Sequence, residues 1–271
     1  MSAAYSMLMC VYAKDRPDWL HFALDSVFAQ TLPAAEVIIV KDGPLTDELE
    51  LVLTQAAANH PTLRFIALPA NRGLGEALRV GVEACQYEWI ARMDADDYAS
   101  PERCKLEFEA LEREHADIVG CDVNEFVGTV DHVIDQRTFP TSHEALVRFA
   151  KRRTPFAHPA VIMRKSLVLK AGSYQSAYLH EDYDLFIRML SAGGRSCSIA
   201  KPLVSVRINE DFIARRGGFK YLRALLRFNR KQLKSGWMSF ADFAARSAAN
   251  TVSCLMPTRL RALLYRRFLR K

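Results

Sequence analysis

The chain has 271 residues, of which 50% are apolar and 25% charged, with a net charge of +6, and this composition predicts a globular protein with an ordinary hydrophobic core. Its six cysteines show no CxxC or paired Cys/His spacing, which favours reduced thiols over disulfides or a zinc site. Since no run of about 18 uncharged apolar residues occurs, and no basic segment precedes an apolar run at the N-terminus, we expect a cytoplasmic protein without a spanning helix or signal peptide.

Short apolar runs alternate with amphipathic segments through the first part of the chain. This order predicts an α/β fold with a mainly parallel sheet and helices on both of its faces. The predicted strands are 7–12, 36–40, 63–68 and 87–93, and the predicted helices are 17–30, 47–58, 74–84 and 100–114.

The pattern is looser after residue 120. Residues 116–126 and 159–165 are predicted as strands, 142–153 and 181–190 as helices, and 197–208 as a closing strand or hairpin. Gly217 and Gly218 form a predicted joint, which is followed by predicted helices at 219–234, 239–254 and 257–270. The chain therefore divides into a main domain, 1–214, and a helical tail, 215–271.

The two parts differ in charge. Residues 215–271 hold fifteen Lys or Arg and one acid, Asp242, for a net charge of +14, so the total of +6 leaves −8 on residues 1–214. A basic tail on an acidic body suggests attraction to an anionic membrane surface, a nucleic acid or a phosphorylated substrate. The tail shows no recognised nucleic-acid-binding signature, so we expect no nucleic acid partner.

Polar residues follow each of the first four predicted strands. Because ligands bind beyond the carboxyl ends of parallel strands, these four loops are expected to border one crevice. The loop residues are Ala13 and Lys14, Asp42 and Gly43, Asn71 to Gly73, and Asp94 to Asp97.

The stretch ARMDADD places three aspartates within four positions after a buried run. Buried carboxylates raise the cost of ionising one another, so positive charge is expected beside them. Asp94 and Asp96, one residue apart, offer hard oxygen ligands to Mg²⁺ or Mn²⁺. An Asp-rich solvated turn with a helix cap is the alternative, and the position at the crevice favours the metal site.

Four segments resemble the inverting glycosyltransferases of family 2, which have the nucleotide-diphosphosugar fold called GT-A. They are residues 10–43, 71–81, 87–97 and 179–190, and the resemblance covers about residues 5–210. It implies a nucleotide-binding half, 1–119, a more variable acceptor-binding half, 120–214, and a metal-bound sugar nucleotide.

The resemblance also implies roles for the acidic turn. Asp96 would coordinate the metal, Asp94 would contact the ribose or the metal through water, and Asp97 would orient the pair. Ala95, between them, is included among the nucleotide-sugar contacts. The bound cation would stabilise the leaving diphosphate.

The resemblance implies further contacts to the sugar nucleotide from residues at the ends of the first three predicted strands. Asp42 is similar to the family aspartate that hydrogen-bonds the base, usually uracil, although a turn residue is the alternative. Val11 and Tyr12 would line the base pocket, and Arg72 and Gly73 would approach the nucleotide, with an ordinary turn before a helix as the open alternative.

Residues 180–184, HEDYD, form a second acidic cluster. Inversion requires a base within reach of the acceptor hydroxyl, and the resemblance assigns Asp182 to this role with Glu181 in support. The alternative is that the acids complement the helix dipole and that Asp184 pairs with Arg188 four residues later.

Two basic residues are candidates for acceptor contacts. His158 precedes a predicted strand, where similar sequences carry an acceptor element, and a hydrogen-bonded structural histidine is the alternative. Arg207 resembles the family R-x-H element, whose histidine position is Asn209 here. If that histidine supplies a metal ligand in relatives, we expect this protein to bind metal more weakly than they do.

The resemblance therefore implies an inverting glycosyltransferase of bacterial O-antigen, capsule or exopolysaccharide synthesis. It would move a hexose or N-acetylhexosamine from a UDP-sugar to a polyprenyl-diphosphate-linked saccharide, on the cytoplasmic face of the inner membrane. The alternatives are a nucleotidyltransferase acting on sugar phosphates and a catalytically silent carbohydrate- or membrane-binding protein. The tail is predicted to lie in the membrane interface or to pack on the main domain.

Overall fold

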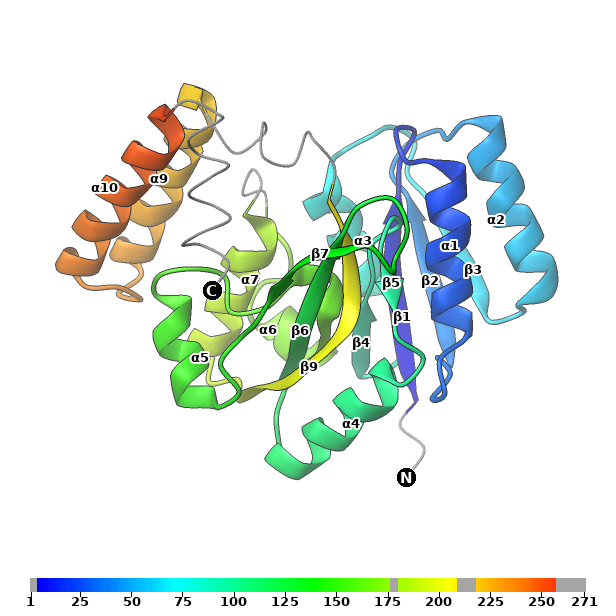
Figure 1. Cartoon of the computed structure of the whole chain (residues 1–271), viewed down its shortest axis with the longest axis horizontal. Coiled ribbons are helices and arrows are strands. Elements are labelled where there is room, and N and C mark those ends of the chain that lie inside the picture. The colour runs from blue at the N-terminus through cyan, green and yellow to red at the C-terminus, as the bar shows by residue number, and fades with distance from the viewer. Residues whose placement is uncertain (1–3, 176–179, 209–217, 257–271) are drawn as a thin grey trace.

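The computed structural model describes residues 4–175, 180–208 and 218–256. A nine-stranded sheet forms its centre (Figure 1). The strands are β1 (Tyr5–Val11), β2 (Glu36–Lys41), β3 (Leu63–Ala67), β4 (Trp89–Arg92), β5 (Tyr98–Ala99), β6 (Ile118–Phe126), β7 (Val133–Arg137), β8 (Val161–Arg164) and β9 (Ser196–Arg207). They lie in the order β3-β2-β1-β4-β8-β6-β9-β5, and β7 pairs with β6.

The sheet is mixed rather than parallel throughout. Strands β1 to β4 form a parallel block, as predicted, and β6 and β9 are also parallel. Strand β8 runs antiparallel to both β4 and β6 and joins the two parallel groups, while β5 and β7 pair antiparallel with β9 and β6. The parallel block therefore has its carboxyl ends, and the loops that follow them, at one edge.

Helices cover both faces of the sheet, as expected from strands that are apolar along their whole length. One apolar core contains side chains of α1 (Pro17–Phe28), α2 (Asp47–Asn59) and α4 (Arg103–Glu114). The other contains side chains of α3 (Leu74–Ala84), α5 (His143–Ala150), α6 (Lys165–Lys170) and α7 (Glu181–Ser191). In β1, Met7 and Met9 face the first core and Leu8 the second, so consecutive side chains anchor opposite layers.

The C-terminal helices form a pair beside α7, at the far end of the molecule from α1 and α2 (Figure 1). Helices α9 (Gly218–Lys234) and α10 (Phe240–Leu255) agree with the predicted 219–234 and 239–254. Asn229 Nδ2 donates to Ser247 Oγ at 3.1 Å, and Leu222, Leu225 and Cys254 pack between the two helices. Gly217, Asn209 and the predicted helix 257–270 lie outside the described residues.

None of the helices within the described ranges combines the length and apolar character needed to cross a bilayer. The basic pair α9 and α10 is amphipathic instead, with one face packed and the other exposed.

Gly43 fixes the loop after β2 against the loop before α3. Its φ is +90°, and a Cβ at this position would lie 2.6 Å from the backbone nitrogen of Asn71. Any larger residue therefore combines left-handed backbone strain with a collision against main chain.

We predict that Gly43→Ala lowers the free energy of unfolding more than Gly128→Ala. Gly128 also has a positive φ, +72°, but no atom lies within 4 Å of its Cβ position among the described residues. Both replacements carry strain of about 1–3 kcal/mol, and Gly43→Ala adds an overpacking cost of about 1–3 kcal/mol. Urea denaturation measures the difference, and equal losses for the two variants would contradict the prediction.

Candidate functional site

The acidic turn that follows β4 brings three carboxylates together. Asp94, Asp96 and Asp97 each offer an oxygen atom, and these atoms lie within 4.8 Å of one another. The turn lies at the carboxyl edge of the parallel block, where the sequence predicted a ligand site. Clustered carboxylate oxygens are the ligand type that Mg²⁺ and Mn²⁺ prefer, so the residues present fit a divalent cation.

Two arginines offset part of the charge of this turn. Arg92, the last residue of β4, is 1% exposed and forms an ion pair with Asp94. From β9, the backbone nitrogen of Arg207 donates to Asp97 Oδ1 at 2.8 Å, and Arg207 Nε donates to the carbonyl oxygen of Asp96 at 3.0 Å. The positive charge that the sequence led us to expect therefore comes, in part, from the protein itself.

The aspartates remain short of positive charge despite these contacts. Burial, with Asp94 as a second cause, raises the pKa of Asp96 to about 6, against the opposing effects of Arg92 and Arg207. Burial and the neighbouring Asp96 raise the pKa of Asp97 well above its ordinary value. A divalent cation would favour the ionised carboxylates, which is a second respect in which the cluster fits a metal.

Asp15 is a fourth carboxylate near this turn, and the sequence did not single it out. It follows β1, and its Oδ2 accepts a hydrogen bond from the backbone nitrogen of Tyr12 at 2.9 Å. Burial raises the pKa of Asp15 to about 7, and Asp96 and Asp94 add to the increase, whereas the Tyr12 bond opposes it. Its position two residues after Ala13 in the first strand-end loop was the signal available in the sequence.

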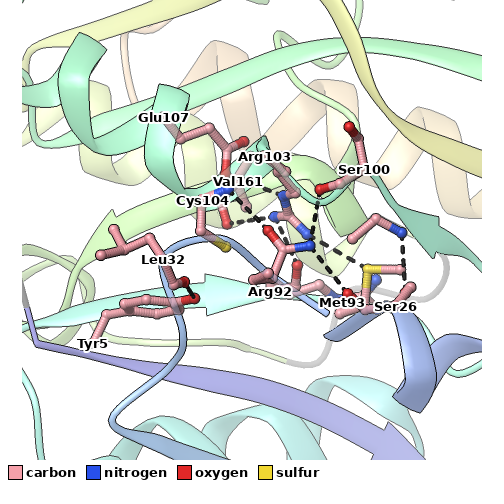
Figure 2. Close-up of polar contacts among 12 residues, drawn as sticks. Tyr5, Ser26, Leu32, Arg92, Met93, Ser100, Arg103, Cys104, Glu107 and Val161 are labelled. Carbon is pink, nitrogen blue, oxygen red and sulfur yellow. Dashed lines mark hydrogen bonds and ion pairs between the residues drawn. The ribbon is translucent and has the colours of Figure 1, made fainter. Parts of the chain in front are cut away.

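A buried arginine of α4 holds the strand end that carries the turn (Figure 2). Arg103 Nη2 donates to the carbonyl oxygen of Arg92 at 2.9 Å, and Arg103 Nε donates to Glu107 Oε2 at 3.1 Å. Both Arg103 and Glu107 are fully buried. This buried pair could not be predicted from the sequence, because Arg and Glu four residues apart usually form a surface pair on a helix.

Asp42 links two of the loops at the sheet edge. Its Oδ1 accepts a hydrogen bond from the backbone nitrogen of Arg72 at 2.7 Å, and its Oδ2 accepts one from that of Gly73 at 3.0 Å. The backbone nitrogen of Asp42 also donates to the carbonyl oxygen of Val11 at 2.8 Å. Asp42 therefore does more than shape its own turn, since it fixes the 71–73 loop beside Val11.

The other residues that were predicted to bind the nucleotide sugar lie around Asp42. Val11 is buried at the end of β1, whereas Tyr12 is 38% exposed. Arg72 is exposed at the start of the α3 loop. The structure thus brings Val11, Tyr12, Asp42, Arg72 and Gly73 to one edge, and their binding roles remain predictions.

Glu181 and Asp182 open α7 and are half-buried. A Cβ placed on Gly75, in the first turn of α3, would lie 3.6 Å from Glu181 Cβ, so the two helix starts face each other. Burial, and then Asp182, raise the pKa of Glu181, while the Arg92 charge opposes the increase. The second acidic cluster therefore lies within electrostatic reach of the arginine that pairs with Asp94.

Tyr174 and His158 form a hydrogen-bonded pair. His158 Nε2 is 2.9 Å from the Tyr174 hydroxyl, and burial, together with Arg92, lowers the pKa of His158 well below its ordinary value. Burial raises the pKa of Tyr174, and Asp182 and Asp94 both contribute. The Tyr174 hydroxyl is therefore affected by the charges of both acidic clusters. His158 is thus a hydrogen-bonded histidine, the alternative interpretation of the sequence, and its contact with an acceptor stays a prediction.

Arg207 was predicted to contact the acceptor, and the structure places its guanidinium against the acidic turn and an aromatic cluster. The guanidinium carbon lies 4.5 Å from the ring centroid of Phe126 and 4.6 Å from that of Trp19. Arg207 Nη1 also donates to the carbonyl oxygen of Gly128 at 2.6 Å. These contacts give Arg207 a role in holding the turn, whatever else it binds.

Comparison with protein families gives a match to the model described as glycosyl transferase family 2 over residues 6–171. The amylovoran biosynthesis glycosyltransferase AmsE of Erwinia amylovora is 34% identical, over 96% of this chain and 97% of the relative. The UDP-Gal:alpha-D-GlcNAc-diphosphoundecaprenol beta-1,3-galactosyltransferase of Escherichia coli is 31% identical, over 98% of this chain and 97% of the relative.

Among solved structures, TarS 1–349 of S. aureus in complex with UDP-GlcNAc is similar with a TM-score of 0.70 and 17% identity. The match covers 97% of this chain and 75% of that chain. This likeness confirms the predicted GT-A fold, with helices on both faces of the sheet. The sheet itself is curled and mixed.

Proposed function

The chain belongs to glycosyl transferase family 2, and on that premise we propose that it moves a hexose or N-acetylhexosamine from a UDP-sugar to a lipid-linked saccharide in bacterial surface-polysaccharide synthesis. One observation carries this proposal: an acidic turn suited to a divalent cation and a second acid pair lie within electrostatic reach of one buried hydroxyl, that of Tyr174. The Escherichia coli galactosyltransferase, with its UDP-Gal donor and diphosphoundecaprenol-linked acceptor, supports the substrate classes.

The donor would bind at the carboxyl edge of the parallel block. Asp94 and Asp96 would hold Mn²⁺ or Mg²⁺, which when bound neutralises the charge that develops on a leaving diphosphate. Asp42 would receive the base while it holds the 71–73 loop in place, and the exposed Tyr12 ring would cover the base. Arg92 keeps the Asp94 side chain oriented through their ion pair.

The acceptor would approach from α7. Asp182, supported by Glu181, would accept the proton of the acceptor hydroxyl as its oxygen forms a bond to the anomeric carbon and the bond to the UDP oxygen breaks. A single displacement of this kind inverts the anomeric centre, so an α-linked donor gives a β-linked product. A helix N-terminus favours the ionised form of an acid and so weakens it as a base, unless burial or a neighbouring acid opposes this effect, as at Glu181. Where the helix start dominates, we expect late proton transfer, when the sugar is cation-like.

Two other activities are compatible with an acidic site on such a sheet. A nucleotidyltransferase would release pyrophosphate rather than UDP, and it usually has a glycine-rich loop after the first strand, whereas CVYAKDRPDW contains no glycine. A silent binding protein would have no need of both acid clusters. Release of UDP as the product would favour the transferase over the nucleotidyltransferase. Calorimetry tests the silent protein, because Mn²⁺-dependent UDP binding favours the transferase and an absence of nucleotide binding favours the silent protein.

The tail supports a peripheral position on the cytoplasmic face of the inner membrane. Residues 215–271 hold a net charge of +14, and Arg223, Arg227 and Arg230 of α9 are exposed. Phe219 and Phe240 are 76% and 72% exposed near the starts of α9 and α10. Basic and aromatic side chains on a packed helical pair are suited to an anionic lipid surface near a lipid-linked acceptor.

We expect Asp96→Ala to abolish Mn²⁺-dependent UDP binding and sugar transfer, because it removes a central oxygen ligand of the acidic turn. Isothermal titration of UDP with and without Mn²⁺ measures the first effect. Asp131→Ala, which removes an exposed aspartate, is the matched control and should behave as wild type. Full activity of Asp96→Ala would remove the metal assignment.

Asp182→Asn should retain UDP affinity and lose transfer by a factor of about 10²–10⁴, the usual contribution of a general base. The amide keeps the size of the side chain but cannot accept the proton. Single-turnover assays of UDP release, together with UDP titration, test both halves of the expectation. A collapse of UDP affinity would instead make Asp182 a donor-binding residue.

Replacement of Arg223, Arg227 and Arg230 together by Gln should weaken binding to phosphatidylglycerol vesicles about 10²-fold at low salt, since each basic residue near the surface contributes about 1 kcal/mol. The control replaces the exposed Lys105, Arg113 and Lys201, which lie on the main domain and represent the same loss of charge. Vesicle sedimentation measures binding. Equal weakening in both triple variants would show that α9 is not the lipid-binding face.

A further inference from the structure

Asp184, two residues after the proposed base, is fully buried and has partners on two helices. Arg188 Nε lies 2.8 Å from its Oδ2, which confirms the predicted pairing within α7. The other oxygen, Oδ1, lies 2.7 Å from Lys231 Nζ and accepts a hydrogen bond from Gln232 Nε2 at 3.4 Å. Because Lys231 and Gln232 belong to α9, the carboxylate of Asp184 ties the proposed catalytic helix to the C-terminal pair.

The same network holds the turn that carries Tyr174. Arg188 donates from Nη1 to the carbonyl oxygen of Ala171 and from Nη2 to that of Ser173, the latter at 2.7 Å. Lys231 Nζ also donates to Gln175 Oε1 at 3.3 Å. Residues 171–175, α7 and α9 are therefore fixed to one another around a single buried carboxylate.

Ring contacts also attach the start of α7 to α9. The His180 ring, at the N-cap of α7, lies 5.6 Å from that of Tyr221 and 5.2 Å from that of Phe228, both on α9. The Tyr183 ring lies 5.1 Å from that of Phe228, and its hydroxyl accepts a hydrogen bond from Arg246 of α10 at 3.0 Å.

The spacing of these contacts sets the direction of the two proposed catalytic acids. Residues 180, 183 and 184 share one face of a helix, and that face is held by α9 and α10. Glu181 and Asp182 lie on the remaining arc of the same turn, where Glu181 faces Gly75 of α3. A rotation or shift of α7 against α9 would therefore move Asp182 directly.

We propose that Asp184 and Lys231 are positioning residues for the transfer step. Through this pair, α9 sets the position of the first turn of α7 along the helix axis and its rotation about that axis. The proposal rests on the proposed function, because it takes Asp182 as the base. A base must come within about 2.6–3.2 Å of the proton it removes, and a displacement of about 1 Å can lower the rate about 10²-fold. Residues 218–256 then belong functionally to the acceptor half.

Lys231 is the better residue to change. Its side chain is 47% exposed, and Asp184 keeps the Arg188 ion pair when Lys231 is removed, so the carboxylate is not left buried without a cation. Lys234, one turn later on α9, is exposed and has no ion pair within the ranges that the structure describes. Lys231→Met and Lys234→Met thus remove the same charge from the same helix, but only the first breaks the contact with α7.

The test measures transfer from UDP-Gal and UDP-GlcNAc to a short-chain alkyl diphosphate analogue of GlcNAc-diphosphoundecaprenol, which makes membrane binding irrelevant. We expect Lys231→Met to lower kcat about tenfold, with KM for the donor and UDP affinity within about twofold of wild type. Lys234→Met should match wild type, and Lys231→Arg should recover most of kcat. Hydrogen exchange should increase at the first-turn amides of α7 in Lys231→Met alone.

Equal kcat in Lys231→Met and Lys234→Met, on an active wild-type enzyme, would overturn this proposal alone. A loss of kcat that is matched by loss of UDP affinity would also overturn it, because the effect would then not be specific to the acceptor side. A wild-type enzyme that releases no UDP with any of these substrates would refute the proposed function, and this inference with it.

Discussion

The site depends on how negative charge is accommodated at the end of β4. Three aspartates have oxygen atoms within 4.8 Å of one another, and Asp15 adds a fourth carboxylate nearby. An isolated buried ion costs several kcal/mol, so this turn needs positive charge to persist in an ionised state. Arg92, at the end of β4, supplies part of this positive charge through its ion pair with Asp94, and Arg207 of β9 contacts the turn at Asp96. The incomplete balance suits a turn that accepts a divalent cation together with an anionic diphosphate.

The topology makes this balance possible. Arg92 ends a strand inside the parallel block, and Arg103 of α4 holds its carbonyl oxygen, so the acidic turn leaves the sheet from a fixed point. The antiparallel strand β8 then joins the second half of the sheet to β4, and α7 packs with α3 on the same face. Two acidic clusters, 84 to 88 positions apart in the chain, thereby both act electrostatically on Tyr174, through Asp94 and Asp182.

Much of this arrangement could be predicted from the sequence, because the strands of the parallel block are continuous apolar runs separated by amphipathic helices. The acidic turn, Asp42 and the start of α7 could be predicted for the same reason, since each follows or opens a strongly patterned element. Strand β7 was missed because it is short and partly exposed, with Val133 and Ile134 over 40% accessible to solvent. Strand β5 has two residues, too few for any pattern.

The contacts that support the site could not be read in the same way. Arginines are rarely buried, so nothing marked Arg92 and Arg103 as interior residues. The contact between Asp184 and Lys231 spans 47 positions and depends on how the C-terminal pair packs, whereas the Asp184 and Arg188 pair follows from helix spacing alone. Local pattern therefore predicts where the acids lie, and tertiary packing decides what holds them.

The most direct measurement is anomalous diffraction from a crystal of the protein grown with Mn²⁺ and UDP. The account predicts one manganese peak at the acidic turn, bound by oxygens of Asp94 and Asp96 and by the diphosphate, with Asp182 facing the opposite side of the space for the sugar. A manganese ion lodged elsewhere, or an Asp182 carboxylate turned away from the diphosphate, would contradict it.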